Sequence, residues 1–312
     1  GINKGRKKEG LEPFKPIFGC EMYVARHHKT DKIAENGDKS GYHLIVLAKN
    51  IKGYKNLIQL VSRAWVDGFY YRPRTDREDL EKYHEGLIVC SACIAGEVPA
   101  KILRGDMEGA REACEWYHRV FGDDYYLELQ RHEVTDPTLL ANRETFPLPQ
   151  KANKVLIEMA KEYGIKLVCT NDCHFEDKDT AEAHDHLLCL STGKDLDDPD
   201  RMRYTKQEWF KTRQEMNDIF SDIPEALTNT LEILDKVEIY SIEHGPIMPF
   251  FPIPEDFGTE EEWRQKFSTE DLYREFTTDE NGENQLSPEE GQKVIDRLGG
   301  YDKIYRIKFE AD

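Results

Sequence analysis

The sequence predicts an α/β fold built on a sheet with parallel strands. Residues 125–130 and 165–169 are apolar and strand-like, and residues 150–163 between them carry apolar side chains three and four positions apart, which is typical of an amphipathic helix. A strand, a helix and a strand of these lengths form a crossover unit, which pairs its two strands in parallel. Similar alternation earlier in the chain favours an α/β barrel or a doubly wound sheet.

The first elements of this pattern lie near the amino end. Residues 17–24 and 43–48 predict two strands, and the polar residues 25–41 between them predict a long loop. A helix follows, with Asn50 as its N-cap and Gly68 as its stop.

Further elements follow in the same order of strand and helix. Residues 87–89 predict another strand, and residues 107–121 predict a helix capped by Asp106. After the crossover unit, residues 206–218 and 224–236 predict two more helices. These elements complete the α/β domain.

Proline content predicts a domain boundary at residues 244–257. This segment contains four prolines, and proline lacks a backbone donor and restrains its neighbour, so we expect an extended connector. The boundary separates a first domain, residues 1–243, from residues 258–312, which are acidic and include a polar turn at 278–282. Because the chain lacks an initiator Met and ends within a pattern, we expect both ends to be edges cut from a longer protein.

Composition limits the classes of function. The formal net charge of −18 argues against nucleic-acid binding by charge alone, although bound metals can reverse the sign locally. No run of about 18 apolar residues and no signal peptide is visible. The seven cysteines are an odd number without disulfide-like spacing, which favours a reducing, cytoplasmic location.

Asp172 and His174 are the first candidates for chemistry. They follow the strand at 165–169, where α/β barrels place their active sites. If the backbone stays extended, side chains two residues apart point to the same face, and a carboxylate beside an imidazole suits zinc or manganese. The alternative is that Asp172 caps the next helix and His174 lies on the surface.

Three other side chains could join them. His132 follows the other strand of the crossover unit, so two strand ends deliver metal-competent groups. Glu21 lies in an apolar strand, where a buried carboxylate needs a partner, although a half-exposed strand would let it face water. His43 opens the next strand and could equally be an ordinary rim residue.

Arg72 and Arg74 form a basic spot beside Tyr70 and Tyr71 in an otherwise acidic chain. Such a spot could bind phosphate or stack on a base, which makes both arginines candidate nucleic-acid contacts. Solvated loop arginines are the alternative.

Other motifs give weaker evidence for a functional site. Cys90 and Cys93 form a lone C-x-x-C without the second pair that a zinc ribbon needs, which favours buried, inert cysteines. His184 and His186 lie two apart on an expected helix and so face different directions. No phosphate-binding or dinucleotide glycine motif is present.

Nine segments form a wider pattern: 18–23, 42–48, 68–74, 126–129, 170–175, 182–185, 189–193, 224–227 and 229–230. In this order and spacing they resemble the PHP domain of the bacterial DNA polymerase III alpha subunit, over about residues 10–275.

The resemblance implies an irregular (β/α)7 barrel that can bind a cluster of divalent metals, zinc or manganese. The family's ligand positions would fall on Glu21, His43, His132, Asp172 and His174. The family begins with a His-x-His motif that nothing before Glu21 matches, so we expect those ligands upstream and the barrel incomplete at its amino terminus.

The resemblance also implies a role in chromosomal replication. The whole protein would be a DNA-directed DNA polymerase that uses magnesium, and residues 258–312 would begin its palm region, with an acidic insert at 277–312. The PHP domain would be a metal-dependent 3′–5′ exonuclease. Implied partners are the DNA primer-template, the sliding clamp, the clamp loader and a proofreading subunit. The alternatives are a non-catalytic scaffold that docks the proofreading subunit, or a stand-alone PHP phosphatase.

Overall fold

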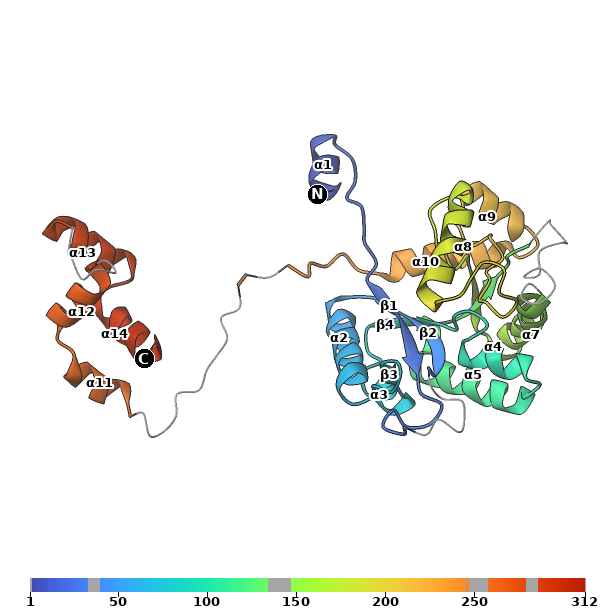
Figure 1. Ribbon diagram of the computed structural model, residues 1–312, viewed down its shortest axis with the longest axis horizontal. Helices are drawn as coiled ribbons and strands as arrows, with labels where there is room; N and C mark the ends of the chain where they lie inside the picture. The colour runs from blue at the N-terminus through green and yellow to red at the C-terminus, as the bar shows by residue number, and fades with distance from the viewer. Residues whose placement is uncertain are drawn as a thin grey trace. The chain divides into compact units, whose positions relative to one another are not determined.

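One mixed sheet organises the first part of the chain in the computed structural model (Figure 1). The structure describes residues 2–32, 40–133, 147–243, 245–246, 258–278 and 286–311. The strands of the sheet are β1 (Gly19–Val24), β2 (Tyr42–Ala48), β3 (Arg74–Thr75), β4 (Leu87–Cys90), β5 (Tyr125–Gln130) and β6 (Lys166–Thr170). Their order is β3-β1-β2-β4-β5-β6. The predicted α/β class is confirmed. No pairing between β3 and β6 is found among the described residues, so closure into a barrel is not observed.

Strand direction is uniform except for β2. The strand pairs β1·β3, β4·β5 and β5·β6 are parallel, whereas β2 runs antiparallel to both β1 and β4. Consequently the start of β2 lies at the edge of the sheet where the other strands end. This single reversal decides which side chains can meet at that edge.

Nine α-helices are described in the first unit, residues 1–243. They are α1 (Ile2–Lys8), α2 (Ile51–Val66), α3 (Arg77–Lys82), α4 (Glu97–Leu103), α5 (Met107–Phe121), α7 (Pro147–Tyr163), α8 (Ala181–Thr192), α9 (Arg213–Ile219) and α10 (Pro224–Lys236). The Asn50 side chain caps α2 by accepting a hydrogen bond from the N–H of Gly53 at 3.0 Å. None of the described helices is both long and apolar enough to cross a bilayer.

The central strands are apolar on both sides because both faces are covered. In β4, Leu87 and Val89 belong to the main core with α2 and α5, whereas Ile88 and Cys90 pack with Ile233 of α10 on the other face. All four residues of β4 are buried. A strand buried on both faces reads as a continuous apolar run, which is the pattern that predicted it.

The helix expected over 206–218 begins only at Arg213. The preceding residues form a tight turn, in which the Glu208 carboxylate accepts hydrogen bonds from the backbone N–H and the hydroxyl of Thr205, at 3.0 and 2.6 Å. Lys206 has a φ of 65° in this turn. Side-chain hydrogen bonds of this kind compete with helical ones, which explains the later start.

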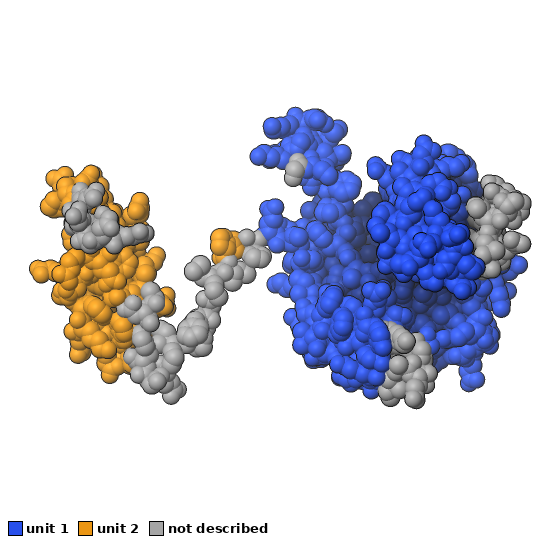
Figure 2. Space-filling view, viewed as in Figure 1, with its two compact units in different colours: residues 1–243 blue, residues 244–312 orange. Residues whose placement is uncertain are grey.

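Residues 244–312 form a second compact unit (Figure 2). Its described helices are α11 (Glu260–Lys266), α12 (Thr269–Thr277), α13 (Pro288–Arg297) and α14 (Tyr301–Ala311). Leu272, Ile295 and Ile304 form its small core. The predicted connector at 244–257 lies almost wholly outside the described residues, as does most of the polar turn at 278–282.

Arg74 in β3 is a structural residue of the first unit. Its side chain is fully buried, and its guanidinium donates to the backbone carbonyls of Gly68 at 3.3 Å and of Lys29 and Asp31 at 2.9 Å. Arg72, in contrast, is exposed. The arginine therefore joins three chain segments that no regular strand or helix connects.

We predict that Arg74→Met lowers the free energy of unfolding by about 3 kcal/mol, because it leaves buried carbonyls without a donor. Chemical denaturation of the first unit measures this change. Arg72→Met is the matched control and is expected to stay within about 0.5 kcal/mol of the parent. Equal stability of the two variants would contradict the structural role of Arg74.

Candidate metal site

The start of β2 brings His43 beside the end of β1. His43 pairs with Tyr23, and Ile45 pairs with Glu21, in the antiparallel register of the two strands. Residues directly opposite each other share a face, and so do residues two apart on one strand. Glu21 and His43 therefore project from the same face, and the Glu21 Oε1 lies 2.7 Å from the His43 Nδ1.

Cys93 completes a group of three metal-competent side chains. Its Sγ lies 3.7 Å from the His43 Nδ1, and the ligand atoms of Glu21, His43 and Cys93 all lie within 4.8 Å of one another. Ligands on a tetrahedral zinc ion are about 3.5 Å apart, given bonds of about 2.0–2.3 Å. Small side-chain movements would therefore bring all three donors onto one ion.

A tight turn after β4 places Cys93 there. Ala92 has a φ of 60°, and the N–H of Gly96 donates to the carbonyl of Cys93 at 2.8 Å. A Cβ on Gly96 would lie 2.0 Å from the Ser91 carbonyl oxygen, so the turn requires glycine. The N–H of His43 donates to the carbonyl of Ala95 at 3.0 Å, which fastens this turn to β2.

Charges within this group are strongly coupled. Hydrogen bonds to Cys93 and to Glu21 raise the pKa of His43 to about 10. The hydrogen bond from His43 lowers the pKa of Glu21, and the charges of His43 and His174 lower it further. The pair thus favours an ionised carboxylate, which is the form that binds a metal.

Asp172 and His174 lie at the same edge, after the end of β6. Asp172 has a φ of 45°, and its backbone carbonyl lies 2.6 Å from the Nδ1 of His174. Burial raises the pKa of Asp172, and the nearby positive charge of His174 opposes this rise. A buried carboxyl of this kind is strongly stabilised in its ionised form by a nearby cation, because the positive charge offsets the cost of burying the negative charge.

The loop before α9 clamps this segment. The Asn171 amide donates to the carbonyls of Gln207 and Trp209 at 2.9 and 2.6 Å, and the His174 N–H donates to the carbonyl of Glu208 at 2.7 Å. The position of Asp172 and His174 is therefore set by backbone contacts on both sides.

The two groups are close enough to interact. The charge of Glu21 raises the pKa of Asp172, and the charge of His174 lowers that of Glu21. Four of the five ligands that the sequence predicts thus lie around one edge of the sheet: Glu21, His43, Asp172 and His174.

His132 is near this edge but is occupied by other contacts. The residue is buried, its Nε2 lies 3.0 Å from the carbonyl oxygen of Asn171, and its Nδ1 lies 3.8 Å from Glu208. Since a carbonyl only accepts, the Nε2 carries the proton. His132 supports the segment before Asp172 and is not among the three grouped ligand residues. Its assignment as a ligand stays a prediction.

Known proteins resemble this chain over part or most of its length. Residues 2–132 match the PHP domain family. The chain is 40% identical over 280 residues to the DNA polymerase III subunit alpha of Borreliella burgdorferi, which covers 88% of this chain and 23% of that protein. The Treponema pallidum protein of the same name is 36% identical over 85% of the chain and 22% of its own length, and that of Deinococcus radiodurans is 33% identical over 94% and 22%.

Residues 2–132 thus match the PHP domain, and most of the chain is similar to DNA polymerase III alpha subunits. The resemblance inferred from the sequence is confirmed. The chain spans less than a quarter of the length of these curated relatives.

Cys93 is the residue of the PHP domain that sequence reasoning missed. The sequence predicts two buried, inert cysteines in the C-x-x-C, and Cys90 is indeed buried, but Cys93 is only partly buried and faces His43. The available signal was its place at the end of a strand, three residues before Gly96. All seven cysteines are free.

The two arginines predicted to contact nucleic acid differ in their exposure to solvent. Arg74 is fully buried against backbone carbonyls, so its guanidinium has no exposed surface to meet a phosphate, and Arg72 alone of the two is accessible.

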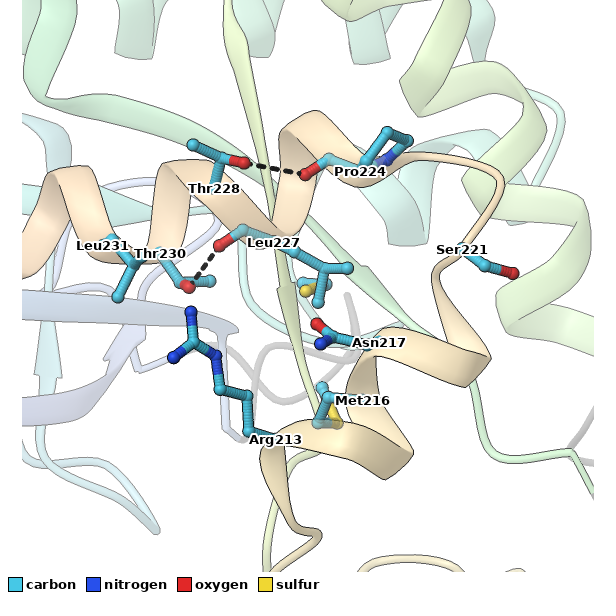
Figure 3. Close-up of a pocket in the computed structure, with 10 residues that line it drawn as sticks. Arg213, Met216, Asn217, Ser221, Pro224, Leu227, Thr228, Thr230 and Leu231 are labelled. Carbon is cyan, nitrogen blue, oxygen red and sulfur yellow. Dashed lines mark hydrogen bonds between the residues drawn. The ribbon is translucent and has the colours of Figure 1, made fainter.

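A pocket of about 630 Å³ lies apart from the metal-competent side chains (Figure 3). It lies between α9 and α10, with Cys169 of β6 also in its lining. Figure 3 shows Arg213 extending from α9 toward Thr230 of α10. The lining contains none of the predicted ligands, so the volume of this pocket does not mark the candidate metal site.

Glu128 is a buried carboxyl beneath the site. It accepts hydrogen bonds from the Thr170 hydroxyl and, at 3.0 Å, from the Gln130 amide, while its Oε2 has no hydrogen-bond partner. Burial raises its pKa, and the charge of Asp172 adds to the rise. Folding therefore favours the protonated carboxyl, and its contribution to stability is lost as the pH rises past the ordinary glutamate value of about 4.3.

We predict that Glu128→Gln gains stability relative to the parent as the pH rises from about 4 to about 8, because the amide cannot ionise. Thermal unfolding at several pH values measures the difference in melting temperature between variant and parent. Glu158→Gln, at an exposed position on α7, is the control and should show a difference that does not change with pH. A constant difference for Glu128→Gln would contradict the raised pKa.

Proposed function

We propose that the PHP domain of this chain binds divalent metal ions and, in the intact protein, hydrolyses phosphodiester bonds as a 3′–5′ exonuclease. The observation that carries the proposal is the meeting of Glu21, His43 and Cys93 beside Asp172 and His174 at one edge of the sheet. In an acidic chain, bound metals supply the positive charge that a phosphate substrate needs.

The donor set fits such ions. Carboxylate, imidazole and thiol side chains together suit zinc better than magnesium, because zinc accepts nitrogen and sulfur ligands. Manganese would be better served by the Asp172 and His174 pair. When bound, the metals would polarise the phosphoryl group and make water a stronger nucleophile.

The side chains themselves orient the ligands. The Nδ1 of His174 donates to the carbonyl of Asp172, which leaves the Nε2 as its ligand atom. The Nδ1 of His43 faces both Glu21 and Cys93, so it is the nitrogen that would share an ion with these two side chains. Cys93 would add a sulfur ligand. His132 donates a hydrogen bond to the carbonyl of Asn171, the residue before Asp172.

For the whole protein we propose a DNA-directed DNA polymerase of chromosomal replication, with magnesium at its polymerase site. Residues 1–243 would be the PHP domain, residues 244–257 a connector, and residues 258–312 the start of the palm region with an acidic insert at 277–312. The proposed partners are the primer-template, the sliding clamp, the clamp loader and a proofreading subunit. The names of the relatives support this assignment. The proposed location is the cytoplasm.

We predict that Asp172→Ala in the proposed full-length polymerase abolishes metal-dependent 3′–5′ exonuclease activity and leaves primer extension largely intact, because the polymerase carboxylates would lie elsewhere. Excision of a mispaired primer end, with no other nuclease present, measures the first activity. Excision at the parental rate would favour the scaffold alternative, in which the PHP domain only docks a proofreading subunit.

We also predict that Cys93 is a metal ligand. Cobalt substituted for zinc should give a thiolate-to-metal charge-transfer band in the near ultraviolet, and Cys93→Ser should remove it. Cys173→Ser is the matched control, because Cys173 lies between Asp172 and His174 but its Sγ donates to the carbonyl of Trp209 at 3.6 Å. A band that survives Cys93→Ser and disappears in Cys173→Ser would contradict the assignment.

A further inference from the structure

Tyr204 contacts the site from the loop that joins α8 to α9. Its ring lies against His174, with centroids 4.6 Å apart, and against His184 at 5.2 Å. Tyr204 lies two residues before the helix that the sequence predicts over 206–218, and no sequence motif marks it.

The loop around Tyr204 is firmly anchored. Arg201 forms a two-pronged ion pair with Asp185 of α8, at 2.6 and 2.9 Å, and Glu208 accepts hydrogen bonds from Thr205. Both anchors lie within four residues of Tyr204. The position of its ring is therefore determined by the fold and not by a chance surface contact.

The hydroxyl of Tyr204 lies 3.0 Å from the Nε2 of His174. The Nδ1 of the same ring lies 2.6 Å from the backbone carbonyl of Asp172, which can only accept, so the proton of the neutral imidazole is on the Nδ1. The Nε2 then has a lone pair and accepts from the Tyr204 O–H.

That lone pair is also the one a metal would use. A neutral imidazole nitrogen has a single lone pair in the ring plane, so it can accept a hydrogen bond or bind a metal at about 2.0–2.1 Å, but not both. The tyrosine hydroxyl and the metal therefore compete for one atom.

We propose that Tyr204 is a positioning residue whose hydroxyl caps the Nε2 of His174 in the metal-free site and must be displaced when a metal binds there, so that Tyr204 lowers the metal affinity of the site. This inference rests on the proposed metal-binding function. It identifies a residue that controls occupancy without being a ligand.

Two opposite effects follow from one hydroxyl. The Tyr204–His174 hydrogen bond exists only in the metal-free state, so its loss destabilises that state. The metal-bound state is unaffected, so zinc binding becomes tighter. If Tyr204 had only a structural role, removing its hydroxyl would lower the stability of the chain or leave it unchanged. It would likewise weaken zinc binding or leave it unchanged.

The test uses the full chain and zinc alone. The zinc dissociation constant, measured by competition with a chromophoric chelator, should fall roughly two- to tenfold in Tyr204→Phe, the range that one net hydrogen bond supplies. The melting temperature of the metal-free Tyr204→Phe chain should fall slightly. Tyr23→Phe is the matched control: its ring packs on His43 at 5.2 Å, but no hydrogen bond joins its hydroxyl to that ring in the described contacts. It should leave zinc affinity unchanged.

A double-mutant cycle separates this inference from the proposed function. In a His174→Ala background, Tyr204→Phe should have no further effect on zinc affinity. Suppose that the parent binds zinc, that His174→Ala weakens this binding, and that Tyr204→Phe leaves it unchanged or weakens it. The proposed competition is then overturned, whereas the proposed function stands. If the parent binds no zinc, both are overturned.

Discussion

The reversed direction of β2 is the constraint on which the candidate site depends. Five strands run one way and end at one edge of the sheet, whereas β2 begins there. If β2 ran parallel to its neighbours, His43, its second residue, would lie at the opposite edge of the sheet, about 20 Å away along the strand direction, given the length of a seven-residue strand. The antiparallel register instead places His43 beside Glu21 on one side and beside the turn that carries Cys93 on the other. Sheet topology therefore brings together ligands that are far apart in the chain.

Backbone conformation at the strand ends also helps to bring the candidate ligands together, although two of the residues adopt unfavourable dihedral angles. Ala92 and Asp172 both have positive φ values, which side chains other than glycine adopt rarely, and each lies immediately before or at a candidate ligand. Neither conformation would persist alone. The turn at Ala92 is fastened to β2 by the His43 N–H, and the segment at Asp172 is clamped by the Asn171 amide and the carbonyl of Glu208. These fastenings keep the ligand side chains in place before any ion arrives.

Much of this could be predicted from the sequence, and the exceptions have physical causes. Apolar runs and helical spacing located β1, β2, β4, β5 and β6, because buried strands and amphipathic helices leave periodic patterns. Glu21, His43, Asp172 and His174 were found because polar groups at strand ends stand out against apolar strands. Cys93 was missed because a cysteine in an apolar run looks the same whether it is buried or a ligand. Arg74 is predicted as a nucleic-acid contact because nothing in the sequence shows that the carbonyls of Gly68, Lys29 and Asp31 converge on its guanidinium.

The three histidines at this edge show why residue type alone does not define a metal site. Each ring has two nitrogens, and the partner of one decides what the other can do. The Nδ1 of His43 faces Glu21 and Cys93, the ring of His132 meets the carbonyl of Asn171 and the carboxylate of Glu208, and the ring of His174 lies between the Asp172 carbonyl and the Tyr204 hydroxyl. His43 thus lies among metal-competent groups. His132 contacts the segment before Asp172. The Nε2 of His174 lies within hydrogen-bond distance of the Tyr204 hydroxyl. If this edge of the sheet binds a metal as we propose, the hydrogen-bond partners of these rings would decide which nitrogen is available to the ion.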